Sequence, residues 1–172
     1  ALRAPHPDLA ADRAAFEASL DADRWETPTD LRVNSDAERT FEQAGSGIFR
    51  TSPEGEDRDT FRVSFSAPAA PLRSMRLELL PDEDLPNQGP GLASNGNLVL
   101  TEVTVRIDGE VIPISASRAS FEQPGDPVAQ AHDGALGRGG WAVMRDQDGA
   151  PAEAIFDLEV PGDGLGGQAV EV

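Results

Sequence analysis

Short runs in which hydrophobic and polar residues alternate make up most of this chain from Trp25 onward. A two-residue period places alternate side chains on one face of a strand, so each run predicts a β-strand that is buried on one side. Turn residues separate the runs about every ten positions, which is typical of a β-sandwich. The clearest runs lie at residues 61–66, 76–80, 99–107, 112–116 and 156–160. The expected fold class is therefore all-β: a two-sheet antiparallel β-sandwich of about eight strands, of the jelly-roll or a related type.

One segment departs from this alternation and predicts a helix near the N-terminus. Residues 7–23 begin with a proline, which suits a first helical turn, and acidic residues follow it where the helix dipole favours negative charge. The helix has a narrow apolar stripe, formed by Leu9, Phe16 and Leu20. The sequence therefore divides into an N-terminal helix or linker from a neighbouring domain, residues 1–24, and a β-sandwich module, residues 25–172.

A long connection rich in Pro, Gly and Asn joins two of the predicted strands, between Leu80 and Leu98. Connections of this length inside a compact domain are usually either functional or disordered. The acidic run at residues 82–84 and the amides of Asn95 and Asn97 make the connection a candidate ligand loop. A solvated connection without a ligand is the alternative interpretation.

Composition restricts the classes of partner. The chain has 31 acidic and 14 basic residues, which gives a net charge of −17, and every basic residue is arginine. Binding to the phosphates of a nucleic acid needs a basic face, so we expect no nucleic-acid partner. The absence of cysteine excludes disulfides, thiolate nucleophiles and Cys-based zinc sites. No apolar run approaches the length of a membrane span, so no membrane insertion is expected.

Several short signatures carry a resemblance to a known module. They lie in order at residues 77–80 (Leu-Glu-Leu-Leu), 89–91 (Gly-Pro-Gly), 95–97 (Asn-Gly-Asn) and 100–102 (Leu-Thr-Glu). Together with the segments at 129–134 and 140–142, they resemble a module of large exported planctomycete proteins, which lies between a cytochrome-c-like region and C-terminal domains of uncharacterised function. The resemblance implies an exported protein (periplasmic, cell-surface or extracellular), with its signal outside this chain, and neighbouring domains of the same protein as partners.

The same signatures are similar to those of the galactose-binding, discoidin-like β-sandwich, which hosts many carbohydrate-binding modules. This resemblance implies a polysaccharide or glycan ligand and a structural calcium ion held by Glu102 and Asp133, since Ca²⁺ prefers oxygen ligands. The sequence departs from that pattern at Ala135 and Gly140, which lack the usual side-chain oxygens, and Arg138 adds a positive charge. The Asp-Gly loop also follows the Leu-x-Glu strand, whereas it precedes that strand in the common arrangement.

The only two tryptophans, Trp25 and Trp141, are candidates for stacking on a sugar ring. A flat aromatic face packs against sugar C–H groups while nearby polar groups bind the hydroxyls. For each tryptophan, a packed position in the core is the alternative. The predicted ligand-binding set is Trp141, Asn95, Asn97, Trp25 and Arg138.

Glu102 also has two interpretations. It shares a strand face with leucines, where a buried carboxylate needs a cation or several hydrogen-bond donors. Alternatively, it is an outward-facing carboxylate paired with Arg106, four residues along the strand.

No catalytic motif stands out, and the histidines His6 and His132 lie far apart in the sequence. The first functional hypothesis is therefore a non-catalytic carbohydrate-binding module of a larger exported protein. The second is a structural module that docks neighbouring domains and has no glycan ligand. A hydrolytic enzyme ranks third, because fold resemblance does not establish chemistry.

Overall fold

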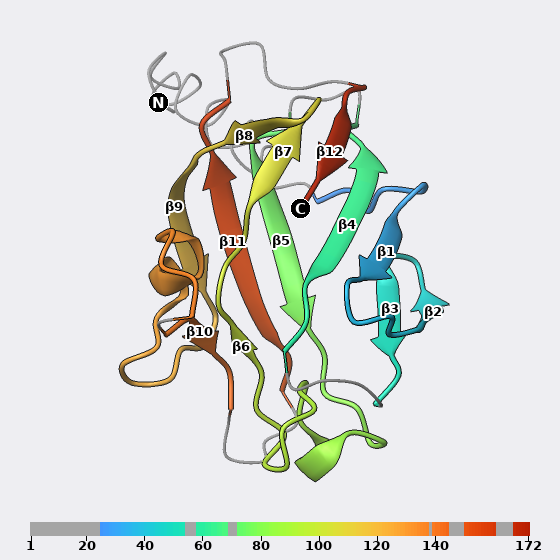
Figure 1. Cartoon of the computed structure of the whole chain (residues 1–172), viewed down its shortest axis with the longest axis vertical. Helices are drawn as coiled ribbons and strands as arrows, with labels where there is room; N and C mark the ends of the chain where they lie inside the picture. Colours follow the sequence, from blue (N-terminus) through green and yellow to red (C-terminus); the bar gives the residue numbers. More distant parts are fainter. Residues whose placement is uncertain (1–24, 54–57, 69–71, 138, 145–149, 161–166) are drawn as a thin grey trace, which may run out of the picture.

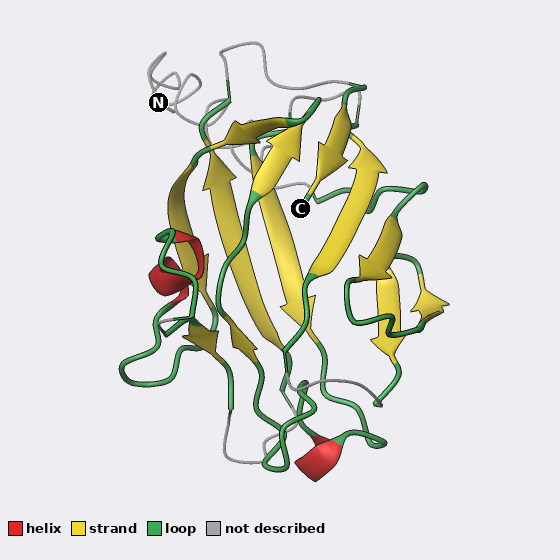
Figure 2. Ribbon diagram, in the orientation of Figure 1, coloured by secondary structure: helices red, strands yellow, loops and turns green. Residues whose placement is uncertain are grey.

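A computed structural model describes residues 25–53, 58–68, 72–137, 139–144, 150–160 and 167–172. The regular secondary structure of these residues is almost entirely β-strand, which confirms the predicted all-β class (Figures 1 and 2). Two short 3₁₀ turns, η1 (Pro86–Gln88) and η2 (Val128–His132), interrupt the strands. The helix predicted at residues 7–23 lies outside the described residues.

The strands of the described residues are short. They are β1 (Arg32–Ser35), β2 (Phe41–Gly45), β3 (Ile48–Thr51), β4 (Phe61–Ser66), β5 (Ser74–Leu79), β6 (Val99–Leu100), β7 (Val105–Ile107), β8 (Glu110–Ile112), β9 (Ile114–Ala119), β10 (Trp141–Ala142), β11 (Ala152–Leu158) and β12 (Ala169–Glu171). One sheet has the strand order β1-β4-β12-β7-β8, and a second has the order β5-β11-β9. The pairs β10-β6 and β2-β3 form two smaller sheets, and all the pairings are antiparallel.

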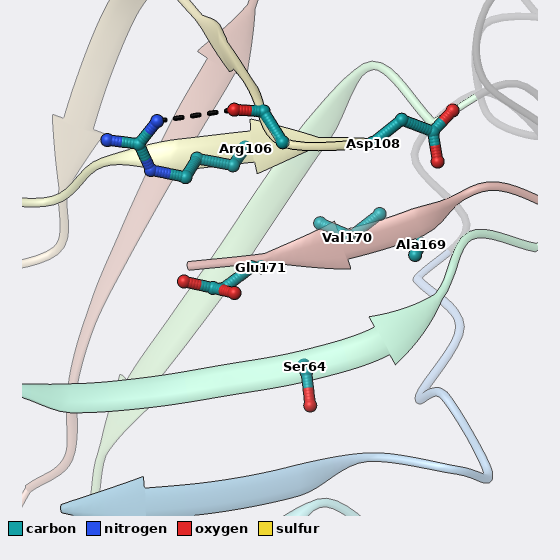
Figure 3. A pocket seen from close by; sticks show the side chains of 7 residues that line it. Ser64, Arg106, Asp108, Ala169, Val170 and Glu171 are labelled. Atoms are coloured by element: carbon teal, nitrogen blue, oxygen red, sulfur yellow. Dashed lines mark hydrogen bonds between the residues drawn. The ribbon is translucent and has the colours of Figure 1, made fainter.

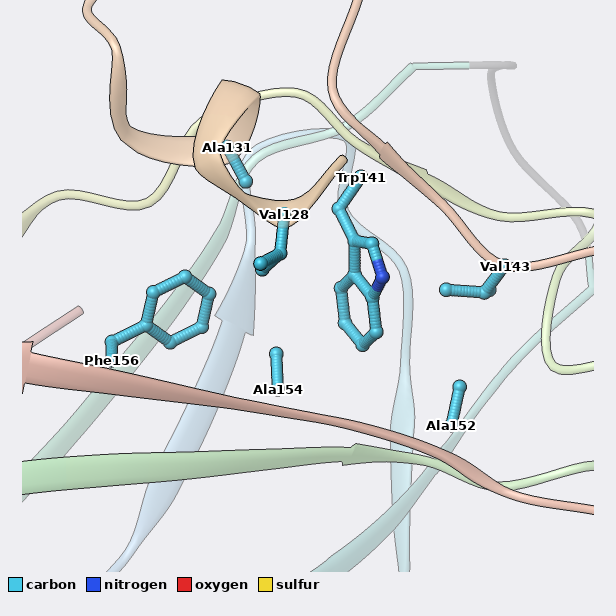
Figure 4. Packing of buried hydrophobic residues seen from close by; sticks show 7 residues of the cluster. All are labelled: Val128, Ala131, Trp141, Val143, Ala152, Ala154 and Phe156. Atoms are coloured by element: carbon cyan, nitrogen blue, oxygen red, sulfur yellow. The ribbon is translucent and has the colours of Figure 1, made fainter. Parts of the chain in front are cut away.

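The two larger sheets share a core and so form the layers of a sandwich. On β11 every second residue is buried, because this central strand alternates between the core and the outer face. Leu158 of β11 packs in one cluster with Val170 of β12 and Val105 of β7, from the opposite sheet. A second cluster gathers around Trp141, Phe156 and Val128, and Figure 4 shows the indole lying between the β11 side chains and the η2 turn.

The run at residues 99–107 is not one strand, and this corrects the predicted pattern. The side chains of Leu98 and Leu100 pack on the core, whereas Val99 is exposed. After the break, Val103 and Val105 point inward, so the alternation shifts by one position between the two segments. The shift arises because the chain leaves the ladder after β6, and the Val103 N–H donates to the carbonyl of Ala131 in η2 at 2.6 Å.

A buried ion pair joins the connection between β1 and β2 to the residues just before β4. Arg39 Nε lies 3.3 Å from Asp59 Oδ2, and the two side chains are only 4% and 6% exposed. The Asp59 carboxylate also accepts hydrogen bonds from Ser35 Oγ and from the backbone N–H groups of Ala37 and Thr60. Burial by itself would raise the pKa of Asp59, but the three hydrogen bonds and the Arg39 charge outweigh it and hold that pKa below its usual value.

Candidate functional site

The connection between β5 and β6, which was the predicted ligand loop, packs against itself. Gly91 N–H donates to the carbonyl of Gly96 at 3.1 Å, and Gly96 N–H donates to Ala93 at 2.7 Å. A Cβ atom added at Gly91 would overlap the carbonyl oxygen of Asn97, and one added at Gly89 would overlap that of Gly96. The Gly-Pro-Gly and Asn-Gly-Asn signatures are therefore two backbone segments in direct contact. The approach at Gly89 and Gly91 is so close that only glycine fits there.

The amides of this connection are used within the fold. Asn97 Oδ1 accepts the Val143 N–H at 3.3 Å, and Asn97 Nδ2 donates to Gln123 Oε1 at 3.2 Å. Asn95 Oδ1 accepts the Asn97 N–H at 3.1 Å, and Asn95 Nδ2 lies 3.1 Å from Met144 Sδ. These contacts join the connection to the segments before and after β10, so Asn97 helps to hold the fold together at this point.

We expect Gly91→Ala to lower the free energy of unfolding by about 2 kcal/mol, because the new methyl group must push two backbone segments apart. For a chain of this size the melting temperature should fall by about 4–8 °C. Gly125→Ala is the matched control, since a Cβ atom there meets no neighbour and only its positive φ of 96° opposes the substitution. Thermal denaturation followed by circular dichroism measures the melting temperature of each variant. An equal fall in melting temperature for Gly91→Ala and Gly125→Ala would contradict the close backbone contact at Gly91.

The two tryptophans have different surroundings. Trp141 is fully buried, and its Nε1–H donates to the carbonyl of Phe121 at 2.8 Å. Its ring therefore has no face free for a sugar, and the alternative of a core position holds for this residue. Trp25 is 36% exposed, and the Arg76 guanidinium of β5 lies 5.1 Å from its ring centroid. Arg138 lies outside the described residues.

Glu102 and the loop of Asp133 are in contact. Glu102 Oε2 accepts the Gly134 N–H at 3.2 Å, and Asp133 Oδ1 accepts the Ala135 N–H at 2.8 Å. The alternative ion pair between Glu102 and Arg106 is not formed. Each carboxylate keeps a second oxygen, which is compatible with a calcium ligand. In the part of the chain that the structure describes, however, no group of three or more Asp, Glu, His or Cys side chains is placed to hold a metal ion. Calcium binding therefore stays a prediction.

A serine and a histidine also lie within hydrogen-bonding distance. Ser117 Oγ is 2.8 Å from His132 Nε2, and the imidazole packs edge-on against Phe156, with ring centroids 6.2 Å apart. Ser117 is paired with Phe156 across β9 and β11, so its side chain faces the core. A catalytic serine needs an open site and donors for an oxyanion, so we interpret this pair as a contact that holds η2 on the sheet.

A groove that the sequence did not suggest lies on the outer face of the five-stranded sheet. It has a volume of about 290 Å³ and crosses β4, β12 and β7 (Figure 3). Val170 and Ile107 are buried in the core. Glu171 follows Val170 and Arg106 precedes Ile107, so both charged side chains point to the opposite, outer face of the sheet. The groove is lined by Ser64, Arg106, Asp108, Gly109, Ala169, Val170 and Glu171.

No family model, curated protein or solved structure matches this chain. The functional argument therefore rests on the residues themselves. Among the described residues, no helix has both the length and the apolar character needed to cross a lipid bilayer.

Charged groups of both signs line the groove. The Arg106 guanidinium donates to the carbonyl of Gly109 at 3.3 Å and keeps its other N–H groups. Glu171 lies 3.8 Å from Arg62, which is held by two hydrogen bonds to Asp36 at 2.7 and 3.1 Å. The hydrogen bonds to Asp36 raise the pKa of Arg62 above its usual value. The open groove thus offers a carboxylate and a guanidinium on neighbouring strands.

Small residues form part of the border of the groove. Ala169 has a short side chain, and Gly109 has none. Asp108 and Gly109 have φ angles of 50° and 87° and form the two-residue turn between β7 and β8, for which Asp-Gly is a favoured sequence. Sequence reasoning missed this site because it depends on the register between β4, β7 and β12, which lie far apart in the chain.

Proposed function

We propose that this chain is a non-catalytic carbohydrate-binding module of a larger exported protein, and that saccharide binds in the groove over β4, β12 and β7. The observation that supports the proposal is the open groove in which Glu171, Arg106 and Ser64 lie on adjacent strands. The jelly-roll and galactose-binding type of the sandwich, its planctomycete relationship and a structural calcium ion at Glu102 and Asp133 are parts of the same proposal.

The chemistry of the groove suits a sugar ring. A carboxylate such as Glu171 accepts hydrogen bonds from two adjacent hydroxyls, a guanidinium such as Arg106 donates to sugar oxygens, and the Ser64 hydroxyl does both. The groove residues include no aromatic side chain, so the stacking contribution that many sugar sites use is missing. We therefore expect weak binding, with a dissociation constant of about 0.1–1 mM.

We expect Glu171→Ala and Arg106→Ala each to weaken saccharide binding about tenfold or more, because each removes a charged hydrogen-bonding group. Affinity electrophoresis through gels that contain neutral polysaccharides measures the loss. The matched control is Glu83→Ala, an exposed carboxylate in the connection after β5, which should leave binding unchanged. Melting temperatures of the variants establish that they remain folded. Unaltered retardation of both groove variants would contradict the proposal.

Docking of neighbouring domains is the second candidate function, and a specific observation favours it. Leu77 and Leu80, in and just after β5, are 37% and 39% exposed, and Trp25 lies nearby over Arg76. β5 is an edge strand of its sheet, so these apolar groups border an unpaired strand edge. A chain that binds no saccharide but associates with the flanking domains of its parent protein through this edge would support docking instead.

A further inference from the structure

The groove is part of a longer row of residues that crosses the five-stranded sheet. The strand register pairs Arg32 of β1 with Ser64 of β4, Ser64 with Glu171 of β12, and Glu171 with Arg106 of β7. Paired residues on adjacent strands place their side chains on the same face, so all four lie on the outer face of the sheet. With strands about 4.8 Å apart, the row from Arg32 to Arg106 extends over about 14 Å.

Each end of this row carries an arginine, and Arg32 also lies close enough to the Asp30 carboxylate, which Ser66 binds, for the two charges to interact. In the part of the chain that the structure describes, neither Arg32 nor Arg106 forms an ion pair, whereas Arg62, beside the row, is held by Asp36 and Glu171. Arg32 is exposed, and it lies one strand beyond the groove on the side of Ser64. No hydrogen bond or ion pair among the described residues uses its guanidinium N–H groups, so they can bind a ligand that extends past the groove and the nearby Asp30 carboxylate can accept from the same ligand.

The spacing and the charge together indicate the class of ligand. Polar groups recur on neighbouring strands at about 4.8 Å, a spacing comparable to the length of one sugar unit in an extended chain. Sulfated or uronic acid polymers would approach a protein with a net charge of −17, which repels them. At short range the Glu171 carboxylate would repel an acidic sugar, and the carboxylates of Asp30, Asp36 and Asp108 offset the three arginines along and beside the row.

We propose that the groove binds a linear, uncharged polysaccharide that lies across the strands, and that Arg32 forms a further subsite for it. This inference rests on the proposed function, since it specifies the ligand and the orientation for the same site. The chain of sugars runs from Arg106 over Glu171 and Ser64 to Arg32. A single sugar or a disaccharide occupies only the groove, and a longer oligosaccharide also reaches Arg32.

The test is a calorimetric titration with a length series of neutral oligosaccharides, namely gluco-, xylo- and manno-oligosaccharides of one to six units. For the unmodified chain, affinity should rise with length and then level off once the oligosaccharide spans the row. Arg32→Ala should weaken binding of the long oligosaccharides about tenfold and leave mono- and disaccharide binding unchanged. Arg118→Ala is the matched control, because Arg118 lies on β9 in the other sheet and pairs with Asp157.

The outcomes separate this inference from the proposed function. If Glu171→Ala abolishes binding while Arg32→Ala leaves the affinity for every oligosaccharide unchanged, the proposed Arg32 subsite is wrong. Saccharide binding in the groove would still be supported. Tighter binding of uronic or sulfated oligosaccharides than of neutral ones would overturn the proposal that the ligand is uncharged. If no oligosaccharide binds in any arm, both proposals fail. Melting curves of the Arg32 and Arg118 variants show whether each is folded under the titration conditions.

Discussion

Trp141→Ala should lower the free energy of unfolding by about 3–5 kcal/mol, the range for removal of a buried tryptophan from a core. Trp141 is fully buried in the cluster with Phe156 and Val128, so the substitution leaves a large cavity between β11 and η2. It also leaves the carbonyl of Phe121 without the indole N–H that it now accepts. Urea denaturation followed by circular dichroism gives the change directly.

Two controls make this result specific. Trp141→Phe keeps most of the apolar volume and should recover a large part of the lost stability. Trp25→Ala removes the other tryptophan, which is 36% exposed, and should cost far less than Trp141→Ala. A Trp141→Ala variant with the stability of the unmodified chain and a loss of saccharide binding would show that the indole contacts the ligand.

Asp59→Ala should lower the free energy of unfolding by about 3 kcal/mol at neutral pH, because it removes a buried carboxylate that pairs with Arg39 and accepts three hydrogen bonds. The effect should depend on pH. The folded-state pKa of Asp59 is below its usual value, so its contribution is fully present above the unfolded pKa of about 3.9 and is lost as the pH falls through the folded pKa. Unfolding free energies measured between pH 7 and pH 2 should therefore converge for the variant and the unmodified chain at the acidic end.

A double substitution tests the cause of this loss. Arg39→Met combined with Asp59→Leu removes both charges of this pair and fills their volume with apolar groups, so it should be more stable than Asp59→Ala alone. A double variant that is less stable than Asp59→Ala would contradict a cost that comes from breaking the ion pair, and would indicate that Arg39 stabilises the fold through its other contacts, such as the hydrogen bond to Ser52.

The strands were predictable from the sequence where the alternation is local and unbroken. The run at residues 61–66 coincides with β4, and the run at 76–80 overlaps β5. The prediction failed where tertiary contacts shift the alternation. Val99 points outward because the chain leaves the ladder after β6, and Ala116 is exposed because the register between β9 and β11 shifts near Leu158. No local pattern records such shifts.

The candidate site was predicted less well than the fold. The signatures in the connection after β5 indicated an unusual loop, and the structure shows why they are glycine and asparagine: Gly91 makes a close backbone contact, and Asn97 links the loop to Val143 and Gln123. Glu102, which the resemblance paired with Asp133 as a calcium ligand, accepts a hydrogen bond from Gly134 in the same loop, and calcium binding there stays a prediction. The groove, by contrast, depends on a strand order in which β12 lies between β4 and β7, and sequence spacing carries no trace of that order.

The central claim is that saccharide binds on the outer face of the five-stranded sheet. Its most direct test is to titrate the isotopically labelled chain with a neutral hexasaccharide that binds and to map the amide shifts by NMR. If saccharide binds there, the largest shifts should lie on β4, β12 and the β7–β8 turn, around Ser64, Glu171 and Asp108. Shifts confined to the connection with Asn95 and Asn97, or to the β5 edge, would contradict it.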